Sequence, residues 1–246
     1  MRILNVVKSI NISQGGPPEV IRNYSSVINR KGKIIKVIKL NMISNFYFIT
    51  TFINKKRNKK LKMFIQNYDI IHFHELWSLK TLFLSYFARK LGKKLIAIPH
   101  GVLDSWSLRE KYLKKKIFSI LFLKKFILSL DAIFFSTKDE FFEAKKNYKL
   151  PFAFIIPNGI NLEKFQRINK IQSKNKKKKI IFFGRIHKKK GIELLLNSIK
   201  SLPSEFFDDF YFEITGPGED SYINNIQKLI NDFNLSSNVF LKNPMS

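Results

Sequence analysis

The stretch "KIIFFGRIHKKKGIELLLNSI", residues 179–199, joins a strand pattern to a helix pattern. An apolar run ends at Gly184-Arg185, and apolar residues at helical spacing follow Lys190-Gly191. A strand that leads through a short loop into a helix is half of a βαβ unit, from which parallel sheets are built. The turn itself needs only the glycine. The arginine and lysine beside it are typical of a binding site for an anion such as a diphosphate.

The same alternation of strand and helix patterns extends along the chain. Runs rich in isoleucine and phenylalanine predict strands at 2–7, 33–40, 69–74, 94–99, 131–136, 152–157, 179–184 and 210–216. Their apolar residues are nearly continuous, which indicates parallel strands buried on both faces. Apolar residues at helical spacing predict helices between them, among others at 20–28, 79–91 and 192–202. We therefore expect an α/β protein with Rossmann-like, doubly wound parallel sheets.

A lysine-rich segment with few apolar side chains and no clear period lies at 167–178. Such a composition predicts a linker between two domains. The first domain would then cover 1–166 and the second 179–246, each with its own Rossmann-like sheet. Because the second region holds only about two βα units, we expect its sheet to be incomplete.

The charge of the chain narrows the classes of partner. Among 246 residues, 45 Lys+Arg against 18 Asp+Glu give a formal net charge of +27. This balance favours nucleic acid, anionic lipid or phosphorylated substrates as partners, unless the lysines only form a solvated surface. The aromatic residues lie in the predicted strands rather than between basic residues, which argues against a nucleic-acid-binding protein.

Composition also bears on the compartment. The sequence has no cysteine, which excludes disulfide bonds and thiolate metal sites. No window approaches the roughly 18–20 apolar residues of a membrane span, and the first residues do not follow the pattern of a signal peptide. These features predict a cytoplasmic protein.

The first predicted turn contains two adjacent glycines, Gly15 and Gly16, between a strand and a helix. Glycine lets the backbone approach a ligand closely, and the free N–H groups at a helix start attract an anion. Pro17 and Pro18 suit the first helical turn, where no N–H donor is needed. The alternative is an ordinary glycine turn. The pattern is neither a dinucleotide fingerprint nor a P-loop.

Further candidate residues follow predicted strands. His100-Gly101 comes directly after the strand at 94–99, at the edge where open α/β sheets bind ligands. A structural histidine and a site histidine are both compatible with this position. Farther along the chain, Ser136 is expected to cap a helix that contains Glu140.

Seven motifs occur in an order that covers nearly the whole chain: "GGPPEVIRNYSSVI", "DIIHFHELWS", "PHGVLDSW", "STKDE", "IIPNGINLEKF", "FFGRIHKKKGIELLL" and "ITGPGEDSYINNI". This series resembles the family 4 retaining glycosyltransferases, which have the GT-B fold of two Rossmann-like domains. "HFHELW" followed by "PHGVLDSW" is similar to the branch that builds bacterial capsule, exopolysaccharide and O-antigen.

The resemblance implies roles for individual residues. The residues that would approach or bind the nucleotide diphosphate sugar are Gly15, Gly16, Arg185, Lys190, Gly216 and Glu219. His100 would contact the transferred sugar at the catalytic centre. For the "GPGE" turn that begins at Gly216, a plain glycine turn is the alternative.

The implied activity is the transfer of a hexose from a nucleotide diphosphate sugar to a growing, lipid-linked cell-surface glycan. It would proceed with retention of configuration and without a metal or cofactor. The family's E-x7-E element is a departure, because Glu205 and Glu213 have this spacing but precede "GPGE". We interpret this match as coincidence, and expect the 246-residue chain as written not to catalyse transfer. The alternative is a non-catalytic remnant that binds nucleotide or a membrane surface.

A basic and apolar segment lies at 108–130. Its lysines and apolar residues are interleaved: Lys114, Lys115, Lys116, Ile117, Phe118, Leu121, Phe122, Lys124 and Lys125. Such a segment suits peripheral contact with the inner face of the cell membrane. The alternative is an ordinary helix packed on the sheet, with its lysines in solvent.

Overall fold

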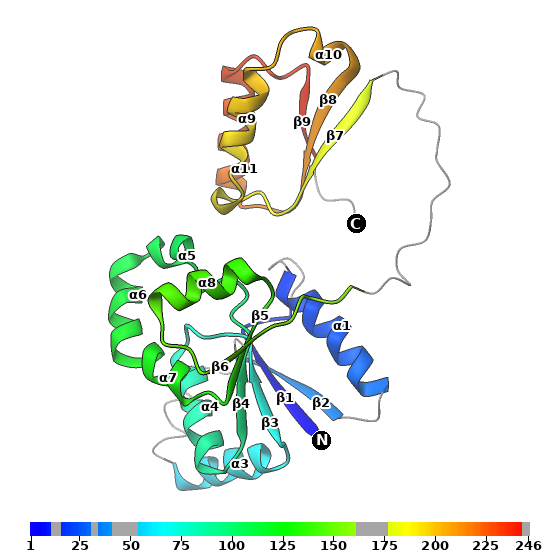
Figure 1. Ribbon diagram of the computed structural model, residues 1–246. Coiled ribbons are helices and arrows are strands. Elements are labelled where there is room, and N and C mark those ends of the chain that lie inside the picture. Colours follow the sequence, from blue (N-terminus) through cyan, green and yellow to red (C-terminus); the bar gives the residue numbers. More distant parts are fainter. Residues whose placement is uncertain (11–15, 31–33, 41–53, 161–176, 243–246) are drawn as a thin grey trace. The chain divides into compact units, whose positions relative to one another are not determined.

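The structure is a computed structural model, and it describes residues 1–10, 16–30, 34–40, 54–160 and 177–242. The chain divides into two compact units, Met1–Lys164 and Phe165–Ser246, and each is described by itself. Both units combine parallel strands with helices (Figure 1), so the expected α/β fold class is confirmed. Most of the predicted linker lies outside the described residues, and the predicted domain boundaries stay a prediction.

The first unit is built on six parallel strands: β1 (Arg2–Val7), β2 (Ile34–Lys39), β3 (Ile70–Phe73), β4 (Lys94–Ala97), β5 (Ala132–Phe135) and β6 (Phe152–Ile155). Their order in the sheet is β2-β1-β3-β4-β5-β6. The chain runs outward from β1 to β2 and then returns to β3 on the other side of β1. Sheets of this kind bind ligands at the carboxyl ends of the strands where the order reverses, which here is between β1 and β3.

The helices of the first unit are α1 (Gly16–Arg30), α3 (Lys55–Gln66), α4 (Leu79–Lys90), α5 (Ser105–Arg109), α6 (Tyr112–Phe118), the π-helical turn η3 (Ser119–Leu123), α7 (Lys124–Ser129) and α8 (Lys138–Asn147). Right-handed crossovers place α1 on one side of the sheet and α4 on the other (Figure 1). The helices predicted at 20–28 and 79–91 are confirmed within α1 and as α4. Gly92 follows the end of α4, where it has a φ of 68°, and Lys93 N–H donates to the Ala88 carbonyl oxygen.

Apolar side chains from the central strands form the core of the first unit. Leu4, Ile71 and Leu95 are fully buried, and they belong to one cluster with Ala88 of α4 and Ile127 of α7. Each large apolar side chain buried in this way contributes about 1.5–3 kcal/mol. The packed central strands therefore give a rigid base to the residues that follow their carboxyl ends.

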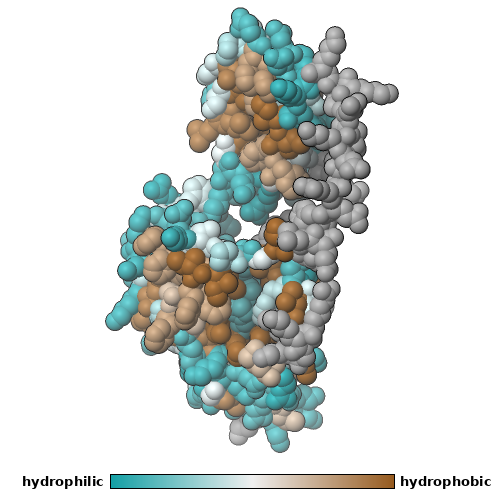
Figure 2. Space-filling model, turned by 45° about the vertical axis from the view of Figure 1, so that its right-hand side comes forward, coloured by the Kyte–Doolittle hydropathy of each residue, from teal (hydrophilic) through white to brown (hydrophobic). Residues whose placement is uncertain are grey.

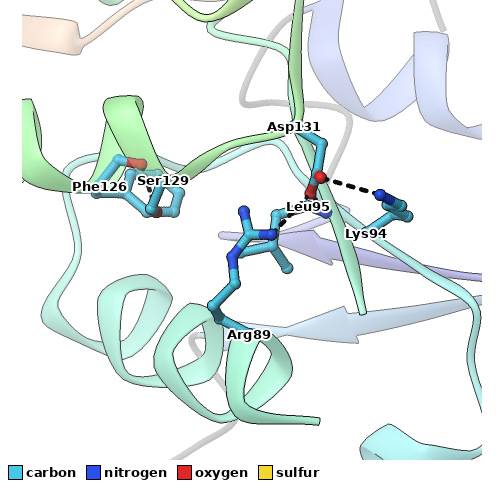
Figure 3. A network of polar contacts seen from close by, with 6 residues as sticks. All are labelled: Arg89, Lys94, Leu95, Phe126, Ser129 and Asp131. Carbon is cyan, nitrogen blue, oxygen red and sulfur yellow. Dashed lines mark hydrogen bonds and ion pairs between the residues drawn. The ribbon is translucent and has the colours of Figure 1, made fainter. Parts of the chain in front are cut away.

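Asp131 joins three elements at the opposite, amino edge of this sheet (Figure 3). Its carboxylate accepts a hydrogen bond from Leu95 N–H at 2.8 Å and forms ion pairs with Arg89 at 3.2 Å and Lys94 at 3.3 Å. Burial alone would raise the pKa of Asp131, but hydrogen bonds from Leu95 and Arg89 outweigh it and lower the pKa. Because it lies away from the carboxyl edge, this network serves the fold rather than a site.

The second unit has a smaller parallel sheet in the order β7-β8-β9. Its elements are β7 (Lys178–Phe183), the 3-10 turn η5 (Lys188–Lys190), α9 (Ile192–Lys200), α10 (Phe206–Asp209), β8 (Phe210–Thr215), α11 (Asp220–Asp232) and β9 (Val239–Lys242). Helices α9 and α11 lie on one side of the sheet (Figure 1), where Leu196 and Ile226 are buried in one cluster with Ile214. The helix predicted at 192–202 is thus confirmed, with its end two residues earlier.

The expectation that the strands are buried on both faces is wrong for the edge strands. β6 and β7 expose most of their residues and β2 exposes three of its six, because an edge strand lies at the margin of the sheet with a neighbour on one side only. Phe183 at the end of β7 is 84% exposed, and hydrophobic side chains reach the surface on the face of the molecule in Figure 2. The short strand β9 was not among the predicted strands.

Candidate functional site

His100 lies three residues after β4, at the carboxyl edge of the first sheet. Its Nε2 atom is 2.9 Å from Nδ1 of His74, which directly follows β3. Nε2 of His74 is in turn 3.2 Å from the side-chain oxygen of Asn5 in β1. Three neighbouring strands thus bring one polar side chain each to the point where the strand order reverses.

A third histidine belongs to the same cluster. The ring of His72 in β3 lies 4.5 Å from the ring of His74, centroid to centroid, and its Nδ1 is 3.4 Å from the Tyr24 hydroxyl of α1. The rings of His74 and His100 stack with centroids 5.2 Å apart. Three of the four histidines of the chain therefore gather in one place.

The backbone at His100 is held in an uncommon conformation. His100 has a φ of 54°, and Gly101 has a φ of 75°. The Glu140 carboxylate of α8 accepts hydrogen bonds from Gly101 N–H at 2.6 Å and from Ser136 N–H at 2.9 Å. Backbone strain of this kind is concentrated at functional sites, where surrounding contacts maintain it.

The prediction that Ser136 caps α8 is wrong. Thr137, not Ser136, caps the helix, because its hydroxyl accepts a hydrogen bond from Glu140 N–H. Ser136 lies one residue earlier and instead donates its hydroxyl hydrogen to the Glu140 carboxylate at 2.7 Å. Glu140 therefore connects the start of α8 to the turn that follows His100.

The histidine cluster is electrically neutral at physiological pH. Burial, together with the nearby His100, lowers the pKa of His72 to about 3. Burial, with His72 and His100 adding to it, lowers the pKa of His74 well below its ordinary value. Burial also lowers the pKa of His100, although the charge of Glu140 opposes this shift. A neutral imidazole can donate one hydrogen bond and accept another.

The glycine pair of the first turn is only partly described. Helix α1 begins at Gly16 and has Pro17 and Pro18 in its first turn, as the sequence predicts. Gly15 lies outside the described residues. The start of α1 follows β1, so it belongs to the same carboxyl edge as the histidine cluster.

In the second unit, Arg185 and Lys190 lie between β7 and α9. Arg185 follows the carboxyl end of β7, and Lys190 ends η5, one residue before Gly191 at the start of α9. Both side chains are exposed. The side chain of His187 accepts a hydrogen bond from Lys189 N–H at 3.2 Å and so shapes the tip of this loop.

The "GPGE" turn packs directly against this loop. Gly184 N–H donates to the Thr215 carbonyl oxygen, and Ile186 N–H donates to the Pro217 carbonyl oxygen. A Cβ atom on Gly216 would lie 1.8 Å from the Gly184 carbonyl oxygen, so this position requires glycine for packing.

Glu219 completes the set of candidate residues in the second unit. It is exposed and directly precedes α11. Arg185, Lys190, Gly216 and Glu219 therefore share the carboxyl edge of the second sheet. Their roles in binding stay predictions.

Sequence reasoning missed Asn5 and His74 as site residues. His72 and His74 are two positions apart, so their side chains lie on the same side of β3 and its extension. A polar pair at the end of an apolar strand was the available signal. The contact with Asn5 had no such signal, because it joins residues 69 positions apart.

The described parts of the chain contain neither a cluster of metal-binding side chains nor a membrane-spanning helix. No group of three or more His, Asp or Glu side chains in these parts is placed to hold a metal ion. None of the helices in the described ranges is long and apolar enough to cross a membrane. The expectation that the protein needs no metal stays a prediction.

Two family models together match nearly the whole chain. The model of Glycosyltransferase Family 4 matches residues 13–164, and that of Glycosyl transferases group 1 matches residues 163–246. Comparison of the sequence with curated proteins gives no match.

Solved structures share the fold at low sequence identity. HepE (Alr3699) from Anabaena, in complex with UDP and glucose, is 13% identical, with a TM-score of 0.70 over 100% of this chain and 70% of that chain. WaaG, a glycosyltransferase involved in lipopolysaccharide biosynthesis, is 13% identical, with a TM-score of 0.63 over 100% and 70%. A UDP-forming trehalose-phosphate synthase from Burkholderia xenovorans is 9% identical, with a TM-score of 0.64 over 100% and 75%.

These structural matches show the GT-B fold, whereas the family follows from the sequence models. The first model alone covers more than half of the chain. Family and fold together support transferase activity with nucleotide sugars as donors. The protein belongs to Glycosyltransferase Family 4.

Proposed function

We propose that this protein transfers a hexose from a nucleotide diphosphate sugar to a lipid-linked glycan of the cell surface, with retention of configuration. The observation that carries the proposal is the exposed pair Arg185 and Lys190 in the loop between β7 and the start of α9. Membership of the glycosyltransferase family supports the reaction type. Retention and the lipid-linked acceptor rest on the resemblance of the motifs.

The chemistry of this loop suits a departing diphosphate. Negative charge grows on the diphosphate as its bond to the sugar breaks, and fixed cations stabilise that charge. The guanidinium of Arg185 can hold two phosphate oxygens, and Lys190 adds a point charge beside the helix start. In this proposal the two side chains supply the positive charge that a metal ion supplies in other enzymes, and His100 contacts the transferred sugar.

Calorimetry with UDP and GDP tests the role of the loop. Replacing both Arg185 and Lys190 by alanine should weaken binding at least tenfold, because a hydrogen bond to a charged group contributes about 1.5–3 kcal/mol. Lys188→Ala is the matched control, since it removes one exposed charge from the same loop. Equal affinity of the double variant and the control for both nucleotides would contradict the proposal.

Transfer itself is tested with a panel of nucleotide sugars and a lipid-phosphate acceptor. In a form of the protein that carries the family's E-x7-E element, the expected result is acceptor-dependent release of UDP or GDP, with the anomeric configuration of the donor preserved in the product. Inversion would contradict the retaining mechanism. Nucleotide binding without any turnover would favour the alternative, a non-catalytic binding protein.

We further propose that the first unit contacts an anionic membrane surface at the cytoplasmic face. Helix α6 buries none of its residues. Leu113, Ile117 and Leu121, spaced four residues apart, are 72%, 59% and 59% exposed. Residues at this spacing lie on one side of a helix. The inward side of the segment consists of other residues, among them Leu123 and Phe126.

Lysines accompany this apolar row. Lys114, Lys116, Lys124 and Lys125 are exposed. Lys115 is not part of the basic surface, because it donates to the Ser107 carbonyl oxygen and lies near the ring of Trp77. An apolar row with exposed lysines suits the interface of anionic lipids, where each basic residue contributes about 1 kcal/mol.

Vesicle flotation tests the membrane contact. The protein should float with vesicles of phosphatidylglycerol but much less with phosphatidylcholine alone. Replacing Ile117 and Leu121 by serine should reduce flotation without affecting the core, because both side chains are exposed. Leu194→Ser, on an exposed position of the second unit, is the control. Equal recovery with both lipids would contradict the contact.

A further inference from the structure

Asn5, His74 and His100 form a continuous series of hydrogen bonds at the carboxyl edge of the first sheet. Asn5 is fully buried in β1, between β2 and β3. Its side-chain oxygen is 3.2 Å from His74 Nε2, and His74 Nδ1 is 2.9 Å from His100 Nε2. The planes of the two rings are only 18° apart, so each ring limits the rotation of the other.

The positions of the ring hydrogens follow from this series. An amide oxygen can only accept, so the hydrogen between Asn5 and His74 belongs to Nε2 of His74. A neutral imidazole carries one ring hydrogen, which leaves Nδ1 of His74 with a lone pair. The hydrogen between the two rings therefore belongs to Nε2 of His100. Consequently Nδ1 of His100 has a lone pair and can accept a hydrogen bond.

Asn5 thus determines the tautomer of His100 without contacting its ring. If the amide were reversed, its NH2 group would donate to His74 Nε2, and both rings would change tautomer. In other proteins, metal-binding histidines are oriented in the same way by the hydrogen-bond partner of the ring nitrogen that does not bind the metal. The turn at His100 is fixed independently by the hydrogen bond from Gly101 N–H to Glu140.

We propose that Asn5 and His74 are positioning residues that hold His100 in the Nε2–H tautomer, with Nδ1 as the acceptor for a hydroxyl group of the transferred sugar. This inference rests on the proposed function for the contact between His100 and the sugar. The series of hydrogen bonds from Asn5 through His74 to His100, called the relay below, does not depend on that contact.

Nitrogen-15 NMR of the histidine-labelled protein tests the relay directly, since the ring nitrogen shifts distinguish the tautomers. The four histidine signals are assigned from single His→Gln variants. At pH 7 His74 and His100 should each carry their hydrogen on Nε2. A hydrogen on Nδ1 of either ring in the unmodified protein would overturn the proposal, whatever the variants do.

Two variants of Asn5 then test whether this residue determines the tautomer of His100. Asn5→Leu removes the acceptor at similar size and should give a mixture of tautomers in both rings. Asn5→Asp retains an acceptor oxygen and should preserve the Nε2–H tautomers. An unchanged His100 signal in folded Asn5→Leu would overturn the proposal. If Asn5→Leu does not fold, the tautomers of the unmodified protein and of Asn5→Asp decide.

Kinetics separate the relay from the proposed function. Asn5→Leu should lower kcat roughly tenfold, the worth of one hydrogen bond, with little change in KM for the nucleotide sugar, and Asn5→Asp should restore most of it. Altered tautomers with unchanged kcat would overturn the positioning role. Tautomers that respond as expected in a protein without transferase activity would confirm the relay and contradict only the proposed function.

Discussion

Lowering the pH from 7 to 5 should destabilise the first unit through its buried histidines. Burial lowers the pKa values of His72, His74 and His100, so the folded unit keeps all three rings neutral. In the unfolded chain, imidazole takes up a proton below about pH 6.5. The unfolded state then binds more protons than the folded state, so the free energy of unfolding falls as the pH falls.

The size of this loss in the free energy of unfolding can be calculated for His72, because its folded-state pKa is about 3. Between pH 6.5 and the folded-state pKa, one such group changes the free energy of unfolding by about 1.4 kcal/mol per pH unit. From pH 7 to 5, His72 alone should therefore remove about 2 kcal/mol. His74 and His100 act in the same direction. This loss is large beside the roughly 5–15 kcal/mol that stabilise a typical domain.

Urea unfolding at pH 7, 6 and 5, followed by tryptophan fluorescence, measures this loss. Both tryptophans, Trp77 and Trp106, belong to the first unit, so the signal reports that unit alone. His72→Phe keeps an aromatic ring but cannot titrate, and should lose about 2 kcal/mol less than the natural protein between pH 7 and 5. His187→Gln, in the second unit, is the control.

The comparison is made within each variant, so a change in absolute stability from the substitution itself does not affect it. If His72→Phe loses as much stability between pH 7 and 5 as the natural protein, His72 is not held neutral by burial. The reasoning about the cluster would then be refuted.

Three further changes test individual contacts. Gly216→Ala should lower the melting temperature and cost about 1–3 kcal/mol, because its Cβ would collide with the Gly184 carbonyl oxygen. Glu140→Gln should cost about 1.5–3 kcal/mol in urea unfolding, since its carboxylate accepts from Gly101 N–H. Asp131→Asn should cost about 1–2 kcal/mol at pH 7. Because the folded pKa of Asp131 is lowered, its contribution is present above the unfolded value near 3.9 and disappears as the pH falls through the folded value.

Local patterns were sufficient to determine the fold class. The alternation of apolar runs with helical spacing predicts the strands of the central sheet within one or two residues, because it reports burial along the chain itself. Gly92 marks the end of α4 for another local reason, since a positive φ at that place favours glycine over other residues. The strand β9 escaped prediction because its apolar run spans only residues 239–241.

The sequence also determined which strand end is followed by positively charged side chains. Arg185 and Lys190 follow an apolar run and precede a helix, and the structure places them in that loop. The sequence left two explanations for Gly216. Only the tertiary structure shows the close approach of Gly184, which requires glycine there whether or not the turn binds a ligand.

The partners of His100 were decided by tertiary structure. Asn5 and His74 are 69 positions apart, and His74 and His100 are 26 apart. They meet because the sheet places β1, β3 and β4 side by side, with β2 on the far side of β1. Periodicity shows which side of a strand is buried but not which strand lies next to it. The order of strands depends on the packing of the whole sheet, and that order made a relay out of three distant polar residues.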